Sequence, residues 1–176
     1  MIMIKENILV MRGDITTLGI DAIVTNADPL LMGGEGIDAA IHRAAGKGME
    51  RECRAFRGCP RGQARITQGH KLTARFVIHA VGPLYVDGVS GEDELLRSSI
   101  RDSLKLAAQF GIHTIAFPTS GGGRGGFPID EAAMIAVGVV REWMRENERP
   151  SAVIFCCVTE DAAQIYRSLV GSMDGL

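Results

Sequence analysis

A glycine-rich stretch between an apolar run and a helical pattern constrains this chain more than any other feature. The apolar run at residues 115–117 stops at Pro118, and a helical pattern begins at Ile129. This order is typical of a buried strand, a loop and a helix start. The loop carries Gly121, Gly122, Gly123, Arg124, Gly125 and Gly126, followed by Phe127. Such a loop brings backbone N–H groups close to a phosphate, and the helix N-terminus adds a favourable partial charge.

A second glycine turn has the same surroundings. Gly33, Gly34, Glu35 and Gly36 also follow an apolar strand pattern and precede a helical pattern. Arg124 is the only full positive charge in the first glycine loop. The two loops together predict a site that holds a diphosphate from two sides.

Strand and helix patterns alternate along the whole chain. Strands are expected at residues 7–11, 22–24, 64–67, 75–80, 115–117 and 152–158, the last of them central because it is continuously apolar. Helices are expected at residues 37–46, 49–56, 93–110, 129–146 and 161–170. The alternation predicts one domain over residues 1–176, an α/β fold with three layers, α/β/α, around a mixed, mostly parallel sheet. Ligand loops are expected at the carboxyl ends of the strands.

Composition excludes several classes of protein. With 46% hydrophobic residues, 23% charged residues and a net charge of −2, the 176-residue chain resembles an ordinary globular protein and carries no basic stripe for bulk nucleic-acid binding. No apolar run is long enough to cross a membrane, and no signal peptide pattern opens the chain. Cys53, Cys59, Cys156 and Cys157 form no CxxC pair. We therefore expect reduced thiols, a cytoplasmic location, no zinc or other metal site and no cofactor.

We compared the first glycine loop with two other phosphate-binding patterns, GxGxxG and the lysine-bearing phosphate loop. Gly121, Gly123 and Gly126 match GxGxxG, but late in the chain and without a ribose-binding acidic residue after a following strand. A dinucleotide dehydrogenase is therefore disfavoured, and the absence of a GK[ST] ending excludes a lysine-bearing phosphate loop.

Several segments, in order along the chain, resemble one known family. They are GDIT at residues 13–16, TNADPLLMGGEGIDAAIHRAAG at 25–46, CPRGQARITQG at 59–69, RFVIHAVGP at 75–83, and IAFP and GFP within 115–128. The chain is similar to a macro domain of the bacterial, MacroD-like, ADP-ribose-processing type. The resemblance implies binding of ADP-ribose or an ADP-ribosylated protein, and we expect the protein to be a monomer. It also implies an ADP-ribosyl hydrolase that removes ADP-ribose from acidic side chains or deacetylates O-acetyl-ADP-ribose.

The resemblance assigns roles to matching positions. Asp14 would accept a hydrogen bond from the adenine amino group, residues 33–37 would wrap the diphosphate and distal ribose, and Asp38 would position or activate water. Residues 121–124 would hold the phosphates from the other side. The implied ligand contacts are Asp14, Ile15, Asn26, Gly33, Gly34, Glu35, Gly36, Ile37, Gly121, Gly122, Gly123, Arg124, Gly125 and Phe127. Asp38 and Asp28 are the implied catalytic residues.

The chain departs from the family pattern at five positions in or beside the implied site: Thr25, Asp28, Glu35, Gly125 and Val158. Thr25 to Asp28 reads TNAD where the family has NAAN, so Asp28 replaces an amide that both donates and accepts with a carboxylate that only accepts. Glu35 replaces a usual glycine, Gly125 a usual aromatic residue, and Val158 the aromatic or amide residue often found over the adenine.

Each candidate also has a purely structural interpretation. Asp14 could cap a turn, Asp38 a helix and Asp28 a loop, while Glu35 could be a solvated charge. His42, His79 and Cys157 read as structural residues within a helix or strand. Three functions stay open: an ADP-ribosyl hydrolase, a non-catalytic ADP-ribose-binding module, and a protein for another nucleotide or phosphosugar. In the third, Asp28, Glu35 and Asp38 would hold a divalent cation.

Overall fold

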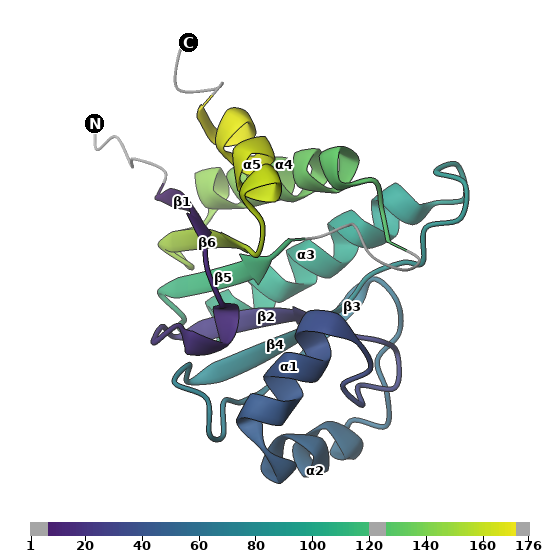
Figure 1. The fold of residues 1–176 in the computed structure, drawn as a ribbon, viewed down its shortest axis with the longest axis vertical. Coiled ribbons are helices and arrows are strands. Elements are labelled where there is room, and N and C mark those ends of the chain that lie inside the picture. The colour runs from purple at the N-terminus through teal and green to yellow at the C-terminus, as the bar shows by residue number, and fades with distance from the viewer. Residues whose placement is uncertain (1–6, 120–125, 172–176) are drawn as a thin grey trace.

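The computed structural model describes residues 7–119 and 126–171, and they form one sheet flanked by helices (Figure 1). The strands are β1 (Ile8–Arg12), β2 (Ala22–Asn26), β3 (Gln63–Gln68), β4 (Phe76–Val81), β5 (Thr114–Pro118) and β6 (Ala152–Cys157). The helices are the 3-10 turn η1 (Ile15–Thr17), α1 (Gly36–Ala45), α2 (Lys47–Ala55), α3 (Glu92–Gln109), α4 (Ile129–Glu146) and α5 (Glu160–Gly171).

The sheet is mixed and mostly parallel, as the alternating pattern predicts. Its strand order is β1-β6-β5-β2-β4-β3, and only the β3–β4 pair is antiparallel. The apolar strand β6 lies inside the sheet between β1 and β5. All five parallel strands therefore end at one edge, where the loops that follow them meet.

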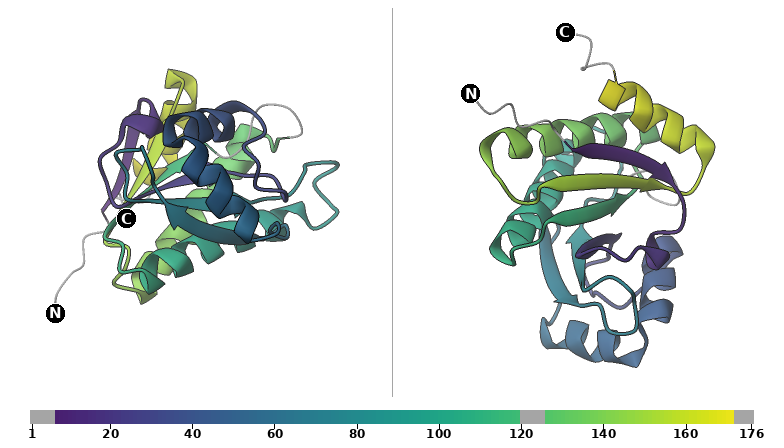
Figure 2. Two further views of the ribbon diagram at one scale, coloured as in Figure 1. Left: turned by 90° about the horizontal axis from the view of Figure 1, so that it is seen from below. Right: turned by 90° about the vertical axis from the view of Figure 1, so that its left-hand side faces the viewer.

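The two faces of the sheet carry separate cores. Successive side chains along a strand point to opposite faces. Val24 thus packs in the cluster under α3, α4 and α5, while its neighbour Ile23 packs in the cluster under α1 and α2. Two further views of the ribbon show these layers (Figure 2). His79 on β4 is two residues from both Val77 and Val81, which pack in the cluster under α1 and α2. Its side chain therefore points to that face.

The crevice expected from this topology lies between β2 and β5. These strands are neighbours, yet β2 leads into α1 on one face and β5 leads into α4 on the other. Open α/β sheets bind ligands at such a switch point, outside the carboxyl ends of the strands. At this point Asn26 Nδ2 donates a hydrogen bond to the carbonyl oxygen of Thr119 at 3.1 Å, which joins the ends of the two strands.

The expected elements are all present, with ends shifted by a residue or two. The break between the first two helices is a single residue, Gly46, whose φ of 87° favours glycine. The 3-10 turn after β1 is an addition that hydrophobic periodicity could not predict, because it is only three residues long. The four cysteines are free thiols, as expected. Within the described residues, no helix is both long and apolar enough to span a membrane.

Candidate functional site

Asp38 is a buried carboxylate at the carboxyl edge of the sheet, beside the switch point where the crevice is expected. It sits in the first turn of α1, and only 3% of its surface is exposed. Its Oδ1 accepts a hydrogen bond from Thr25 Oγ1 at 2.8 Å, and Thr25 is itself fully buried near the end of β2. The hydrogen bond from Thr25 on β2 thus fixes the orientation of the Asp38 carboxylate. A residue that only stabilised the start of a helix would not need this contact.

The surroundings of Asp38 raise its pKa and so make it a weaker acid. Burial raises the pKa of this carboxyl, and the charge of Asp28 adds to the rise. The hydrogen bond from Thr25, the nearby His42 and the backbone N–H of Gly34 act in the opposite direction. A carboxylate with a raised pKa is a stronger base than an exposed one, which suits it to accept a proton from water.

His42 is the functional candidate that sequence reasoning missed. Its Nε2 lies 3.5 Å from Asp38 Oδ1, on the same face of α1 and one turn later. The side chain is mostly buried, and its ring meets that of His79 edge to face with centroids 5.7 Å apart. The available signal was the i, i+4 spacing of Asp38 and His42, which places two residues side by side on a helix.

The second glycine turn fits tightly around these residues. Gly33 has a φ of 73°, and a Cβ atom there would lie 2.6 Å from His42 Cγ. Gly34 is exposed, and its added Cβ would lie 3.0 Å from Asp28 Oδ2. Gly36 has a φ of 58° but open space around it. The glycines therefore serve close packing at Gly33 and backbone conformation at Gly36.

Asp28 organises the loop after β2. Its Oδ1 accepts hydrogen bonds from the N–H groups of Leu30 at 2.8 Å and Leu31 at 3.0 Å. This is the turn-forming role that its structural interpretation predicts. Glu35 is exposed and makes no side-chain cap on α1, as expected for a solvated charge.

The structure does not bring together the three carboxylates of the alternative cation site. Asp28, Glu35 and Asp38 are not among the groups that could share one metal ion in the described part of the chain, where the single such group is His42, Cys53 and His79. One oxygen of Asp28 and one of Asp38 are already used by N–H and O–H donors, and Glu35 is directed to solvent.

Asp14 lies at the same edge but in a very different setting. Its side chain is exposed, and Oδ1 accepts hydrogen bonds from Thr16 N at 3.0 Å and Thr16 Oγ1 at 2.7 Å. These bonds cap η1 and hold the pKa of Asp14 below its ordinary value. The capping role is therefore present. The outward position also leaves the carboxylate accessible to a ligand. Ile15 is buried in the core, so only its backbone could meet a ligand.

The remaining described candidates vary in exposure. Asn26 is exposed at the end of β2, and Ile37 is half-buried against the core under α1 and α2. Phe127 is buried in the core under α3, α4 and α5, and its ring packs at a tilt of 57° against that of Tyr85 with centroids 4.9 Å apart. Val158 is 60% exposed just after β6.

The candidates Gly121, Gly122, Gly123, Arg124 and Gly125 lie outside the described residues. The structure places both ends of that loop, Thr119 after β5 and Gly126 before α4. Both ends belong to the β5–α4 connection that borders the switch point.

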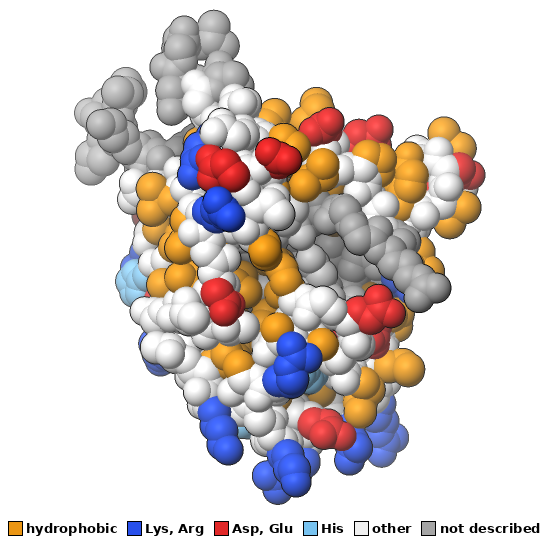
Figure 3. Space-filling model, in the orientation of Figure 1, with side chains coloured by type: hydrophobic (Ala, Val, Ile, Leu, Met, Phe, Trp, Pro, Cys, Tyr) orange, Lys and Arg blue, Asp and Glu red, His pale blue; other side chains and the backbone are white. Residues whose placement is uncertain are grey.

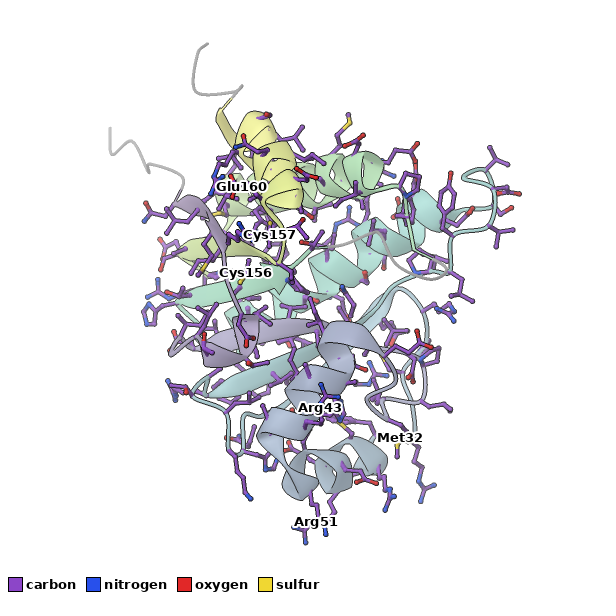
Figure 4. The ribbon with its side chains drawn as sticks, viewed as in Figure 1. Met32, Arg43, Arg51, Cys156, Cys157 and Glu160 are labelled. Carbon is purple, nitrogen blue, oxygen red and sulfur yellow. The ribbon has the colours of Figure 1, made fainter. Side chains whose placement is uncertain are left out.

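A pocket of about 540 Å³ opens beside the second glycine turn. Its lining residues are Met32, Gly33, Gly34, Ala39, His42, Arg43, Gly46, Lys47 and Glu50. Figure 4 shows Arg43 on α1 and Met32 on the neighbouring loop. Lys and Arg side chains gather over the α1 and α2 end of the molecule (Figure 3). His42 thus connects the buried side of Asp38 with an open, partly basic pocket.

Comparison with known proteins agrees with this geometry. The family model described as "Macro domain" matches residues 24–136. The chain belongs to the macro domain family. A macro domain-containing protein of Mesorhizobium japonicum is 49% identical over 168 residues, which cover 96% of each chain. An O-acetyl-ADP-ribose deacetylase of Escherichia fergusonii is 44% identical, with 94% of this chain and 96% of that protein covered.

A solved structure shows the same fold. The macrodomain of Trypanosoma brucei in complex with ADP-ribose superposes with a TM-score of 0.87 at 38% identity, covering 94% of this chain and 69% of that one. The sequence resemblance to macro domains and the predicted sandwich are thus confirmed. The roles of single residues at this macro domain's crevice stay predictions.

Proposed function

We propose that this macro domain binds ADP-ribose in the crevice between β2 and β5 and hydrolyses ADP-ribosyl esters. The substrates would be proteins with ADP-ribose on an acidic side chain, or O-acetyl-ADP-ribose. The related deacetylase and the ADP-ribose-bound macrodomain support this chemistry. The free thiols suit the cytoplasmic location that we propose with it.

The observation that carries the hydrolase proposal is the environment of Asp38. It combines a buried carboxylate, a raised pKa and a fixed orientation at the switch point of the sheet. Perturbed carboxyls at such positions are candidates for acid–base roles. A structural helix cap needs none of the three.

Asp38 would orient a water molecule and accept its proton as the water attacks the ester. The water oxygen bonds to the carbon of the ester C–O bond that breaks, and the proton held by Asp38 passes to the departing oxygen. The products are a carboxylic acid and ADP-ribose with a free hydroxyl. His42, one turn behind, would stabilise the negative charge of Asp38 without touching the substrate. We therefore assign His42 as a positioning residue.

Binding would use the exposed groups at the same edge. The outward carboxylate of Asp14 would accept from the adenine amino group, which distinguishes adenine by its donor. The N-terminus of α1 and the glycine turn would face the diphosphate, where backbone N–H groups and the helix dipole favour anions.

One observation favours a non-catalytic binding module as the second candidate. Asp28 stands where the family has an asparagine, and its Oδ1 is occupied by Leu30 N and Leu31 N. If catalysis depended on an amide at this position, the crevice would still bind ADP-ribose but would not turn it over.

A turnover assay separates the two candidates. The protein would be incubated with a protein mono-ADP-ribosylated on carboxyl groups and, separately, with O-acetyl-ADP-ribose, beside calorimetry with ADP-ribose. We expect binding together with release of ADP-ribose or acetate. Binding without any release from either substrate would establish the binding module, and absence of binding would reject both.

A further inference from the structure

Three ligand-type side chains meet beneath α1, although they come from separate parts of the chain. His42 lies on α1, Cys53 on α2 and His79 on β4. One possible ligand atom from each lies within 4.8 Å of the other two. No other group of this kind exists among residues 7–119 and 126–171. Two imidazoles and a thiol are the donors that zinc prefers in proteins.

The spacing of the donors is close to that of a metal site. Cys53 Sγ and His79 Nε2 are 3.8 Å apart. Ligand atoms of a tetrahedral zinc with bonds of about 2.0–2.3 Å are separated by roughly 3.5 Å. His79 Nε2 also lies 3.0 Å from Thr67 Oγ1, so an ion bound to this nitrogen would replace that contact. The hydroxyl would keep Met49 Sδ, 3.2 Å away, as its acceptor. The cluster would need only small side-chain movements to close around an ion.

Each histidine also has one buried nitrogen that makes no hydrogen bond within the described residues. His79 is fully buried, and its Nδ1 has no hydrogen-bond partner among the described residues; the same holds for Nε2 of His42. An unpartnered polar atom in a core is costly, and native proteins generally pair such atoms. A cation coordinated by His42 Nε2 would give that nitrogen the partner it lacks.

The charges of the site suit a divalent cation. Burial lowers the pKa of His79 to about 3, which keeps this imidazole neutral and able to coordinate. Burial together with the charges of Asp38 and Glu52 raises the pKa of the Cys53 thiol to about 12. Of these causes, the negative charges of Asp38 and Glu52 also favour a cation beside the sulfur. Burial keeps the thiol protonated until an ion displaces the proton. A thiolate, two neutral imidazoles and the adjacent carboxylate of Asp38 would balance a 2+ ion.

We propose that His42, Cys53 and His79 form a binding site for a thiophilic divalent cation such as Zn²⁺. On binding, the Cys53 S–H bond breaks, its proton leaves to solvent, and sulfur and a nitrogen of each imidazole donate electron pairs to the ion. The expectation of no zinc site used spacing along the chain. That spacing carries no signal here, because folding brings the three residues together from different elements.

Occupation of this site would also act on the crevice. A cation bound to His42 withdraws that imidazole from Asp38, whose Oδ1 is 3.5 Å away. This consequence rests on the proposed hydrolase function and predicts that Zn²⁺ inhibits turnover. The binding site itself does not depend on that function, because its donors lie beneath α1 and its test needs no ADP-ribose.

The direct test is titration of the reduced, full-length protein with Co²⁺, a spectroscopic substitute for Zn²⁺. We expect one equivalent to bind with a thiolate-to-cobalt charge-transfer band in the near ultraviolet, and Zn²⁺ to displace it. Cys53→Ala should lose the band. Cys59→Ala is the matched control, because Cys59 is also buried in the core under α1 and α2 but lies outside the cluster.

A second measurement keeps the test decisive where a variant folds poorly. Zn²⁺ should raise the melting temperature of the wild-type protein and of Cys59→Ala, since a ligand that binds the folded state stabilises it. It should not raise that of His42→Gln or Cys53→Ala. Mg²⁺, which prefers oxygen ligands, should leave all four proteins unchanged. No charge-transfer band in the wild type, or a band that persists in Cys53→Ala, would overturn the proposal.

Discussion

Asp14 and Asp38 occupy similar positions in the fold, but they differ in burial and in the direction of their pKa shifts. Each follows a parallel strand at the carboxyl edge of the sheet and stands at the start of a helical segment. Asp14 is exposed, and hydrogen bonds from Thr16 lower its pKa. Asp38 is buried, and burial raises its pKa. The same residue type therefore suits two roles in the proposed function: Asp14 as a hydrogen-bond acceptor for the ligand and Asp38 as a general base.

The difference in burial comes from the segments that surround each carboxylate. The 3-10 turn after β1 leaves Asp14 in solvent, whereas the loop after β2 and helix α1 enclose Asp38 beside Thr25 and His42. Burial disfavours the ionised form of a carboxyl, while hydrogen bonds from N–H and O–H groups favour it. Mutations at the two sites should therefore affect different steps, binding at Asp14 and turnover at Asp38.

Asp38→Asn is expected to have the largest effect. The amide keeps an oxygen that accepts from Thr25 Oγ1 but cannot take a proton from water. Loss of a general base reduces turnover by about 10²–10⁴-fold. Steady-state hydrolysis of O-acetyl-ADP-ribose, beside calorimetry with ADP-ribose, measures both steps. Unchanged turnover in a variant that still binds would place water activation elsewhere.

The pH dependence of hydrolysis tests the same assignment. In the proposed mechanism Asp38 acts in its ionised form, and its pKa is raised above the ordinary value of 3.8. Activity should be complete above this raised pKa and fall roughly tenfold per pH unit below it. The acidic limb should therefore lie at higher pH than that of an exposed carboxyl. A limb at or below pH 3.8 would contradict the buried-base assignment. Asp14→Asn, matched to the wild type, should keep the same limb.

Gly33→Ala should displace the His42 side chain and so disturb its contact with Asp38. The new Cβ would lie 2.6 Å from His42 Cγ, at a φ of 73° that disfavours a side chain. Gly36→Ala is the matched control, since it has a similar φ of 58° but open space. The control should cost about 1–2 kcal/mol of stability from backbone strain alone. We expect a larger fall in the melting temperature and in turnover for Gly33→Ala. Equal losses would show that packing against His42 is unimportant.

Asp14→Asn should separate recognition from capping. Asparagine caps a helical turn as well as aspartate, so the melting temperature should stay close to that of the wild type. The variant presents an NH₂ group in place of one carboxylate oxygen, which cannot accept from the adenine amino group. Binding of ADP-ribose should weaken by about 1–3 kcal/mol. Calorimetry decides, and unchanged affinity would remove Asp14 from the adenine site.

Most of the fold could be predicted from local patterns. The strand β6 is apolar throughout, and α4 begins and ends at the predicted residues because its apolar spacing and acidic first turn are clear. Glycine turns at strand ends indicated the edge that carries the crevice. These signals depend on residues close together in the chain, which is why they can be recognised there.

The chemistry of the site could be predicted only in part. Asp14 and Asp38 have similar local sequence signals, and nothing in their spacing reveals that one is exposed and the other buried. His42 reads as an ordinary helical histidine until the fold brings Asp38, Cys53 and His79 around it. Burial and electrostatics depend on contacts between distant segments, so pKa shifts and the metal-type cluster appear only in three dimensions.

Asp28→Asn is the smallest expected change and the one whose sign matters most. The Asn oxygen can still accept from the N–H groups of Leu30 and Leu31, so the loop should keep its shape and stability. Asp28→Ala, the matched control, loses this cap and should cost about 0.5–2 kcal/mol.

Removing the charge of Asp28 also removes repulsion toward a diphosphate and one of the causes that raise the pKa of Asp38. We therefore expect Asp28→Asn to bind ADP-ribose more tightly, to hydrolyse the ester at least as fast near neutral pH, and to shift the acidic limb to lower pH. Calorimetry and a pH–rate profile on the same preparation measure all three. A large loss of turnover with affinity retained would mean that Asp28 is itself the base, and the contrast between Asp14 and Asp38 would no longer explain catalysis.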